Sequence, residues 1–426
     1  MKFYSLKNPT NKSNFKDAVI KGIADDKGLY FPEEIKKLPT NFWETIENYT
    51  NEEIAFTLIR PFVDNMDDAT LKQILSETLS FDFPVKQIEK NIYALELFHG
   101  PTMAFKDVGA RFMARCLQHY NSNNVTVLVA TSGDTGGAVA NGFYKVSGVN
   151  VVILYPKGKV SDIQEKQLTT LGENITALEV SGTFDVCQDM VKTAFLDKEI
   201  TDRMQLTSAN SINVARWLPQ MFYFAFAYRD LKKHDKEVIF SVPSGNFGNI
   251  CAGMLAQKLG MPIKTFIAST NQNNVVTRFL QTNKYEPKPT IPTISNAMDV
   301  GNPSNFVRIL ELYNQDIEKL KEHLKSFSFT DEKTKETLVK LHQKNNYIAD
   351  PHGAVGYLGL KEFGLSDNQI GVFLETAHPI KFLDVVEPLL QLKMAIPEQI
   401  NSVLNQKKHS IEIATYQELK EFLIKK

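Results

Sequence analysis

One lysine in this sequence stands in a setting where its amine could react. Lys106 lies in the segment HGPTMAFKDVGARFMARCLQ, which we expect to be a loop running into a helix. Phe105, Val108, Phe112 and Cys116 recur at helical spacing and predict a buried stripe beside Lys106. The positive end of the helix dipole favours the neutral amine, which is the form that makes a Schiff base with an aldehyde. Taken without context, an exposed surface lysine is the simpler interpretation.

Four apolar segments run directly into short loops rich in Gly, Ser, Thr and Asn, and each loop opens a predicted helix. The loops are TSGDTGG after Ala130, SANSIN after Thr207, PSGNFGN after Val242 and TAHP after Glu375. Ligands of open α/β sheets bind outside the carboxyl ends of the strands, where helix N-termini present unpaired N–H groups. Any single loop is best explained as an ordinary turn with a capping residue. The four together predict a rim that holds a ligand with several anionic groups.

The loop PSGNFGN has the composition of an anion-binding turn. Gly245 and Gly248 permit positive φ and the close approach of an oxyanion. Each hydrogen bond to a charged acceptor contributes about 1.5–3 kcal/mol, so converging N–H groups can hold a phosphate without Lys or Arg. The segment matches neither a Walker A loop nor the dinucleotide pattern G-x-G-x-x-G. It therefore predicts a general anion site of moderate specificity.

The elements that must position these residues alternate between apolar strands and amphipathic helices from about residue 91. Continuous apolar runs predict buried strands at residues 125–130, 150–155, 237–242, 262–268 and 370–375. Strands of this kind, alternating with helices, indicate a parallel sheet covered on both faces. Residues 316–345 are highly charged and predict helix on a solvated face. Residues 1–90 read as a separate, mainly helical region in which Pro61 ends or kinks a helix.

Composition and length narrow the class of protein. A chain of 426 residues exceeds what one core usually serves, so we expect two or three domains. A net charge of -1 gives no electrostatic reason to expect nucleic acid or an anionic membrane as a partner. Three well-separated cysteines, without a C-x-x-C pair, argue against a disulfide framework and fit a reducing compartment. With no signal-like start, no long apolar span and no clustered metal ligands, we expect a cytoplasmic protein without a metal site.

The motifs together resemble those of one enzyme family. LELFHGPTMAFKDVGARF is similar to the cofactor-lysine segment of threonine synthases, and ATSGDTGGAVA, SANSINVAR, SVPSGNFGN, SNAMDVGNPSN and TAHPIKF look like their other signatures. They occur in the family's order, and the similarity extends to the N-terminal KFYSLKN and GLYFP. The resemblance implies a fold type II pyridoxal-phosphate enzyme of the α/β class. It implies two doubly wound α/β domains, interleaved over residues 91–395 with the cofactor in the cleft between them, and leaves residues 396–426 as a C-terminal helical extension.

The resemblance also implies residue roles for pyridoxal 5'-phosphate. Lys106 matches the lysine that is covalently joined to the cofactor, and Thr376 matches the residue that bonds its pyridine nitrogen. The loop that holds the cofactor phosphate is matched by Gly245, Asn246, Phe247, Gly248 and Asn249. Many family members carry Asp where this chain has Asn249, which leaves the role of that one side chain open.

The implied reaction converts O-phospho-L-homoserine and water to L-threonine and phosphate, a lyase reaction in which Lys106 moves the α-proton. The candidate residues for binding the substrate carboxylate are Ser132, Asp134 and Thr135, with Thr102 as a further substrate contact. The leaving phosphate needs a cationic clamp, and Arg216, expected two turns into the helix after SANSIN, and Arg111 are candidates. For either arginine a surface or domain-pairing role is an equal alternative.

Two rival functions remain open at this level. The first is a pyridoxal-phosphate lyase or synthase acting on a related phosphorylated amino acid, such as phosphoserine with sulfite. The second is a non-catalytic descendant that binds ligands as a regulator, against which the retained Lys106 argues. We expect His99 and His378 to order their loops rather than to catalyse, and we expect a monomer or a homodimer.

Overall fold

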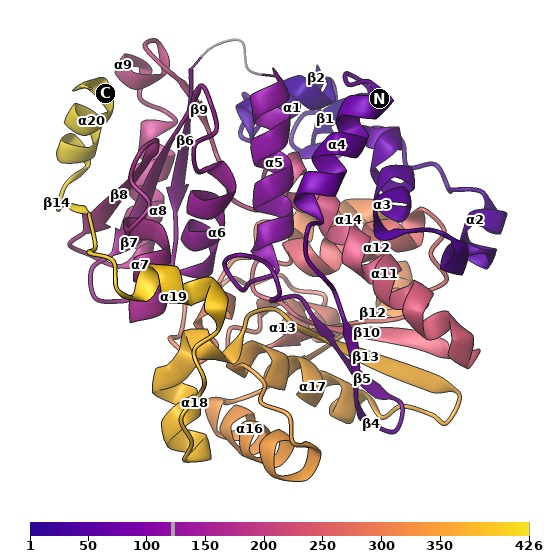
Figure 1. Cartoon of the computed structure of the whole chain (residues 1–426). Helices are drawn as coiled ribbons and strands as arrows, with labels where there is room; N and C mark the ends of the chain where they lie inside the picture. The colour runs from indigo at the N-terminus through magenta and orange to yellow at the C-terminus, as the bar shows by residue number, and fades with distance from the viewer. Residues whose placement is uncertain (121–123, 426) are drawn as a thin grey trace.

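The computed structural model describes residues 1–120 and 124–425, and within these the strands form three sheets. The two larger sheets lie side by side, with the long helix α5 (Lys106–Tyr120) between them (Figure 1). The N-terminal region covers the same side of the molecule as α5 (Figure 1). None of the helices in the described ranges is long and apolar enough to cross a membrane.

The larger sheet has six strands in the order β12-β11-β10-β13-β5-β4. Its pairs are parallel except for β4, which lies antiparallel to β5 at one edge. The strands are β4 (Val85–Glu89), β5 (Ile92–Glu96), β10 (Glu237–Pro243), β11 (Phe266–Thr270), β12 (Leu324–Ser328) and β13 (Gln369–Glu375). Because β4 joins this sheet, residues 85–90 belong with the six-stranded unit and not with the N-terminal region.

The second sheet has five strands, all parallel, in the order β14-β8-β7-β6-β9. The strands are β6 (Val125–Ala130), β7 (Val149–Pro156), β8 (Ile175–Val180), β9 (Gln205–Thr207) and β14 (Ile411–Ile413). The chain builds this sheet between β5 and β10 of the other one and returns to it at β14. The two sheets are therefore interleaved along the chain, and the C-terminal segment adds a strand to the second sheet besides its helices.

Helices cover both faces of the six-stranded sheet. On one face, Ile239, Ile267 and Phe373 pack with the apolar side chains of α16 and α17. On the other, Phe240 and Phe266 pack in a cluster that includes α11 and α12. The helices of the first face are α16 (Asp331–Asn345) and α17 (Pro351–Phe363), with α18 (Leu383–Leu390) beside α16. Those of the second cluster are α11 (Met221–Leu231), α12 (Gly248–Lys258), α13 (Val275–Thr282), α14 (Phe306–Leu312) and α15 (Ile317–His323).

The five-stranded sheet is covered in the same way. Val127 and Ile153 face the cluster that contains α5, α6 and α7, whereas Leu128 and Leu154 face α8 and α20. The helices around this sheet are α6 (Asp134–Phe143), α7 (Asp162–Thr169), α8 (Phe184–Ala194), α9 (Lys198–Thr201), α19 (Glu398–Leu404) and α20 (Tyr416–Lys425). Alternate residues of each strand thus bury on opposite sides, as the doubly wound prediction requires.

The N-terminal region shares its core with the two larger units. Its small antiparallel sheet consists of β1 (Phe3–Ser5), β2 (Lys12–Ser13) and β3 (Tyr30–Pro32). Its helices are α1 (Phe15–Lys21), α2 (Thr40–Glu44), α3 (Asn51–Ile59) and α4 (Asp68–Thr78), with short 3-10 turns at Ile46–Asn48 and Arg60–Phe62. The α-helix before Pro61 ends at Ile59, as predicted from the missing N–H of proline.

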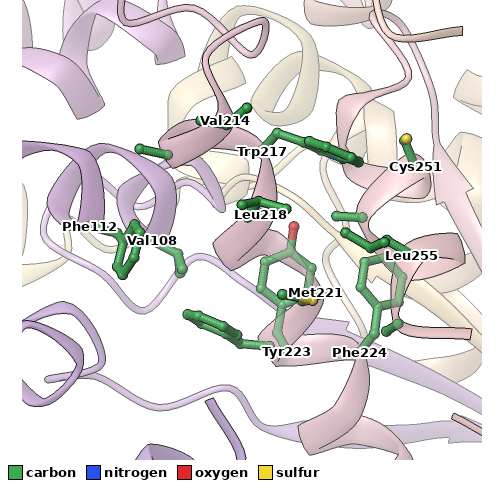
Figure 2. Packing of buried hydrophobic residues seen from close by; sticks show 14 of the residues in the cluster. Val108, Phe112, Val214, Trp217, Leu218, Met221, Tyr223, Phe224, Cys251 and Leu255 are labelled. Carbon is green, nitrogen blue, oxygen red and sulfur yellow. The ribbon is translucent and has the colours of Figure 1, made fainter. Parts of the chain in front are cut away.

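The central core joins α5 to the helices that follow β9 and β10. Val108 and Phe112 of α5 face Val214 and Leu218, while Cys251 and Leu255 of α12 lie on the far side of the same cluster (Figure 2). The intervening segment contains α10 (Val214–Trp217) and the 3-10 turn η3 (Leu218–Gln220). The predicted stripe at Val108, Phe112 and Cys116 is fully buried, so the helix that begins at Lys106 is rigidly held.

Candidate active site

Three neighbouring strands of the six-stranded sheet end side by side at the proposed site. In the parallel register, Glu375 at the end of β13 lies opposite Glu96 at the end of β5, and Phe373 lies opposite Ser241 of β10. The chain continues from β5 to Lys106, from β13 to Thr376, and from β10 to the 245–249 loop. The residues predicted to hold the cofactor therefore meet at one edge of one sheet, as expected for parallel strands.

The backbone joins the Lys106 segment directly to the Thr376 segment. Ala104 and Ala377 form an antiparallel bridge. Across it, the Phe105 N–H donates to the Thr376 carbonyl at 2.9 Å, and the His378 N–H donates to the Met103 carbonyl at 3.0 Å. Lys106, the first residue of α5, is consequently fixed close to Thr376.

Burial and nearby charges set the state of the Lys106 amine. Burial has the largest influence, and it lowers the pKa of Lys106 below its ordinary value. The carboxylates of Asp134 and Asp350 oppose that shift. The cations of Lys381 and Arg216 add to it. The side chain keeps partial solvent access, so its amine can meet a reactant.

The 245–249 loop has the shape of an anion-binding turn. Phe247 takes a left-handed conformation with φ 59°, and α12 begins at Gly248. A Cβ on Gly245 would lie 2.7 Å from Met298 Cα, so only glycine fits against the 295–305 loop there. The backbone N–H groups of residues 245–249 have no acceptor within the part of the chain that the structure describes. They are the donors that a phosphate would use.

Two neighbouring loops hold the 245–249 loop in this shape. Asn246 Nδ2 donates to Ser211 Oγ at 2.7 Å, and Asn246 Oδ1 accepts from the Ser304 N–H at 2.6 Å. Asn305 Nδ2 donates to both Ser211 Oγ and the Asn246 carbonyl at 3.1 Å. The SANSIN and SNAMDVGNPSN segments thus stabilise the turn through hydrogen bonds of neutral side chains.

Asn249 adds a side-chain donor to this loop. Its Oδ1 accepts from the Tyr223 hydroxyl at 2.6 Å, which turns the amide so that Nδ2 points away from Tyr223. Nδ2 is buried and has no partner among residues 1–120 and 124–425. A buried amide donor without an acceptor is unfavourable by itself, so it suits a site that receives an anion.

The 131–135 loop, which follows β6, is organised differently. The Thr131 hydroxyl accepts from the N–H groups of Gly133 and Gly136, at 3.0 and 2.8 Å. These donors are already used. Ser132 and Thr135 are half-buried, and their hydroxyls form no hydrogen bond with any described residue. Of the predicted substrate contacts, these two are the ones left available.

Asp134 is engaged in a buried ion pair. Its Oδ1 lies 2.6 Å from Lys381 Nζ and accepts from Gln164 Nε2 at 3.0 Å. Burial alone would raise the pKa of the Asp134 carboxyl, but the cations of Lys381 and Lys106 outweigh it and hold that pKa below the usual range. A carboxylate so placed organises the loop and repels a substrate carboxylate, which separates Asp134 from Ser132 and Thr135.

Thr102 is hydrogen-bonded to Asp107, the residue that follows Lys106. Its N–H donates to Asp107 Oδ2 at 2.9 Å, and its hydroxyl donates to Asp107 Oδ1. Burial raises the pKa of the Asp107 carboxyl, and these two bonds oppose the rise. Asp107 is therefore more than a first-turn acid, because it closes the loop from Gly100 to Lys106.

The two candidate arginines lie in different places. Arg216 is buried, its charge acts on Lys106, and its Nε has no partner within the described ranges. It is the third residue of α10, not two turns into a helix, and burial lowers its pKa to about 10. Arg111 donates to the Glu77 carbonyl in the last turn of α4 and to Ser80 Oγ just after that helix. Arg111 is thus not brought together with the other predicted site residues.

The two histidines have the ordering contacts that were expected. His99 Nε2 lies 2.9 Å from Glu96 Oε2. His378 Nδ1 accepts from the Ile380 N–H and so caps the 3-10 turn η6 (Pro379–Phe382). Burial, with the charge of His99 next, lowers the pKa of His378 to about 4, so this ring is a neutral acceptor at physiological pH.

Sequence reasoning missed Lys381, Tyr223 and Ser211, whose side chains complete the site. Lys381 was visible within TAHPIKF, and Ser211 within SANSIN, but nothing in either segment singled out these side chains. Tyr223 was assigned to no role among the aromatic residues of α11.

Comparison with known proteins covers the whole chain. The family model described as pyridoxal-phosphate dependent enzyme matches residues 76–373, and that described as threonine synthase N terminus matches residues 2–79. Threonine synthase from Haemophilus influenzae is 45% identical over 403 residues, 94% of this chain and 94% of that protein.

Solved structures agree with these matches. The crystal structure of threonine synthase from Escherichia coli superposes with a TM-score of 0.94 at 40% identity and covers 100% of both chains. The crystal structure of threonine synthase with bound pyridoxal phosphate from Brucella melitensis superposes with a TM-score of 0.93 at 31% identity, over 99% of this chain and 98% of that one.

Proposed function

Because the chain belongs to the threonine synthase family of pyridoxal-phosphate-dependent enzymes, we propose that its substrate is O-phospho-L-homoserine, which it converts with water to L-threonine and phosphate. The chain is a fold type II enzyme of threonine biosynthesis, a carbon–oxygen lyase acting on phosphate. Its residue roles and its substrate are the proposal that follows.

The residues at the sheet edge fit pyridoxal phosphate. The free N–H groups of residues 245–249 and the unpartnered Asn249 Nδ2 suit its phosphate. The absence of any Cβ at Gly245 leaves the backbone close to the 295–305 loop, and Lys106 offers an amine of lowered pKa to its aldehyde. Lys106, Thr376 and the 245–249 loop would hold the cofactor.

Pyridoxal phosphate supplies, when bound, an electron sink that stabilises negative charge on the carbons of the substrate. Lys106 Nζ holds and moves the protons. Burial lowers the pKa of this amine and so favours the neutral form, which is the form that can accept the proton of the substrate α-carbon. The hydrogen bonds of the Ala104–Ala377 bridge keep the lysine backbone in place.

We assign the neutral hydroxyl of Thr376 to the pyridine nitrogen of the cofactor, which is bound by an aspartate in other pyridoxal-phosphate enzymes. A hydroxyl can share a hydrogen bond with a ring nitrogen but leaves that nitrogen largely unprotonated. This tempers the electron withdrawal that an aspartate partner would enforce, and so limits side reactions. Thr376 thus tunes the reaction without moving a proton itself.

We assign substrate binding to residues that follow strands of the five-stranded sheet. The hydroxyls of Ser132 and Thr135 are the donors we assign to the substrate carboxylate, next to the α6 N-terminus. Arg216 is the cation we assign to the leaving phosphate, because its buried charge acts on Lys106 and its Nε has no partner among the described residues, while its Nη1 donates to the Ala209 carbonyl.

The observation that carries this proposal is the meeting of Lys106, Thr376 and the 245–249 loop at one sheet edge. An assay of purified protein with phosphohomoserine should yield threonine and phosphate in equal amounts. Borohydride should trap the cofactor on Lys106. Turnover of phosphoserine with sulfite in place of phosphohomoserine would instead establish the rival synthase, and absence of both turnover and trapping would leave a ligand-binding regulator.

We place the protein in the cytoplasm, as a monomer or a homodimer. Cys116, Cys187 and Cys251 are buried and unpaired in the described structure, which fits a reducing compartment. Fractionation of cells and size-exclusion chromatography with light scattering test these two statements.

A further inference from the structure

A second buried lysine lies close to Lys106. The Lys381 side chain is 0% exposed, and its Nζ is 2.6 Å from Asp134 Oδ1. Nζ also donates to the Thr102 carbonyl at 2.9 Å. Lysine is almost never fully buried unless it is paired, and loss of one partner leaves an uncompensated buried charge. Lys381 and Asp134 therefore depend on each other.

The pair connects three loops that come from both large sheets. Lys381 lies in η6, directly after β13 of the six-stranded sheet, whereas Asp134 opens α6 after β6 of the five-stranded sheet. Thr102 belongs to the loop that leads into Lys106. From α7, Gln164 donates to Asp134, and Gln167 donates to the Thr102 carbonyl at 3.1 Å. The five groups form one buried network at the junction of the two units.

The charges around Lys106 come from each element packed against it. They are Asp134 from α6, Lys381 from η6, Arg216 from α10, and Asp350, which caps α17. Asp350 is committed to His352 Nδ1, at 2.8 Å, and to backbone N–H groups. Asp134 has Lys381 as its cation. If Lys381 were absent, Lys106 would be a neighbouring cation that the buried Asp134 carboxylate could take instead.

We propose that Lys381 and Asp134 form a positioning pair, in which Lys381 occupies the Asp134 carboxylate so that the Lys106 amine stays unpaired, and fixes the 131–135 loop against the Thr102 loop. The pair acts through Lys106 and touches no reacting atom. The inference rests on the proposed role of Lys106 as the reacting amine, and does not depend on which phosphorylated amino acid is the substrate.

The decisive measurement uses the full-length apoenzyme and a small probe, acetic anhydride. The rate of Lys106 acetylation, followed by mass spectrometry across pH, gives the midpoint at which the amine becomes neutral. Lys381→Met should raise that midpoint by at least about one pH unit, equivalent to a tenfold smaller neutral fraction. Asp134→Asn should lower it. The double variant Lys381→Met with Asp134→Asn should return it to within about half a unit of the wild type.

Activity of the holoenzyme provides the second readout. Lys381→Met should lower kcat by about tenfold at neutral pH, and the deficit should shrink as the pH rises, since higher pH restores the neutral amine. Lys393→Met is the matched control. Its ion pair with Glu387 has the same 2.6 Å length but Lys393 is 89% exposed, so both the midpoint and kcat should be unchanged.

We expect the acetylation midpoint to shift in opposite directions in the two single variants and to return in the double variant. A purely structural role would not produce this pattern. Unshifted midpoints in both single variants would overturn the proposal. If Lys381→Met does not fold, Asp134→Asn decides, because an unshifted midpoint there removes the pair from any control over Lys106. The expected shifts together with no turnover of phosphohomoserine would reject the proposed substrate and leave the pair intact.

Discussion

The 245–249 loop and the 131–135 loop look alike in sequence but are built for different tasks. Each follows a buried parallel strand, contains two glycines in or beside the turn, and opens a helix. In the first, the backbone N–H groups have no acceptor within the described residues. In the second, the Thr131 hydroxyl takes two N–H groups, and Lys381 takes the Asp134 carboxylate.

On the proposed function, the 245–249 loop would bind the cofactor and the 131–135 loop would control the charge around Lys106. The 245–249 loop offers open donors and no ionised side chain, so it can hold a dianion without altering the charge balance around Lys106. The 131–135 loop is filled from within and brings a buried ion pair, so its effect is on the position and charge of its neighbours. Among the described residues, the hydroxyls of Ser132 and Thr135 remain free for a ligand.

Removal of the Lys106 amine is the change with the largest expected effect. Lys106→Ala should abolish borohydride trapping of the cofactor and lower kcat by about 1,000-fold, within the range for removal of a general base. Circular dichroism should be unchanged, because α5 is held by its buried stripe and not by Lys106. Substantial threonine formation by this variant would show that another group moves the proton.

Gly245→Ala tests the difference between the two loops by displacing the backbone donors of the 245–249 loop. The added Cβ would lie 2.7 Å from Met298 Cα, so the backbone must move and lose converging donors. Loss of two bonds to a charged acceptor corresponds to an affinity for pyridoxal phosphate on the order of 100-fold weaker. Fluorescence titration of the apoenzyme measures it.

Gly137→Ala, in the other loop's helix, is the matched control. Its Cβ would meet only the Gln167 side chain at 3.3 Å, which can give way. Cofactor affinity should stay within about threefold of the wild type, because alanine is a better helix former than glycine and no donor is displaced. Equal losses in both variants would mean that the two loops do not differ as described.

The sequence located several strands of this fold but missed others, among them the interior strands β5 and β8. The buried strands β6, β10 and β13 were placed to within one residue, because strands covered on both faces are continuous apolar runs. The strand β12 was missed inside a charged segment predicted to be helical, and β14 was missed in the C-terminal segment. Both are edge strands with exposed residues; β12 is largely polar, and β14 has only three residues, which is too short a run to give a strand signal.

The site likewise contains features that the sequence predicted and features that it did not. The loops were predictable, since glycine and small polar residues after an apolar strand leave a local signature. The buried role of Lys381 was not, because a lysine is ordinarily solvated and only a partner distant in the sequence, here Asp134, makes it a core residue. Partners far away in the sequence leave no local pattern, and a single chain does not reveal them.

If the 131–135 loop is filled, the cation for the leaving phosphate must come from elsewhere, and Arg216 is the candidate. Arg216→Ala should raise KM for phosphohomoserine by about 10- to 100-fold, as for one or two lost bonds to a charged group, while cofactor absorbance persists. Steady-state kinetics measures it, and unchanged kinetics would remove Arg216 from the site. Arg111→Ala is the matched control, and should change KM by less than about twofold because Arg111 bonds the end of α4.

The smallest expected effect tests whether a side chain adds to the open loop. Asn249→Ala removes Nδ2, the buried donor without a partner in the described structure, and should weaken pyridoxal phosphate binding by about tenfold, the lower bound for one bond to a charged acceptor. Tyr223→Phe should weaken it less, because it removes only the 2.6 Å bond that orients the amide. Titration of the apoenzyme with inorganic phosphate should show the same order, since the donor acts on the phosphate alone. An affinity unaltered in Asn249→Ala would mean that the backbone donors suffice, and that the amide serves only to bind Tyr223.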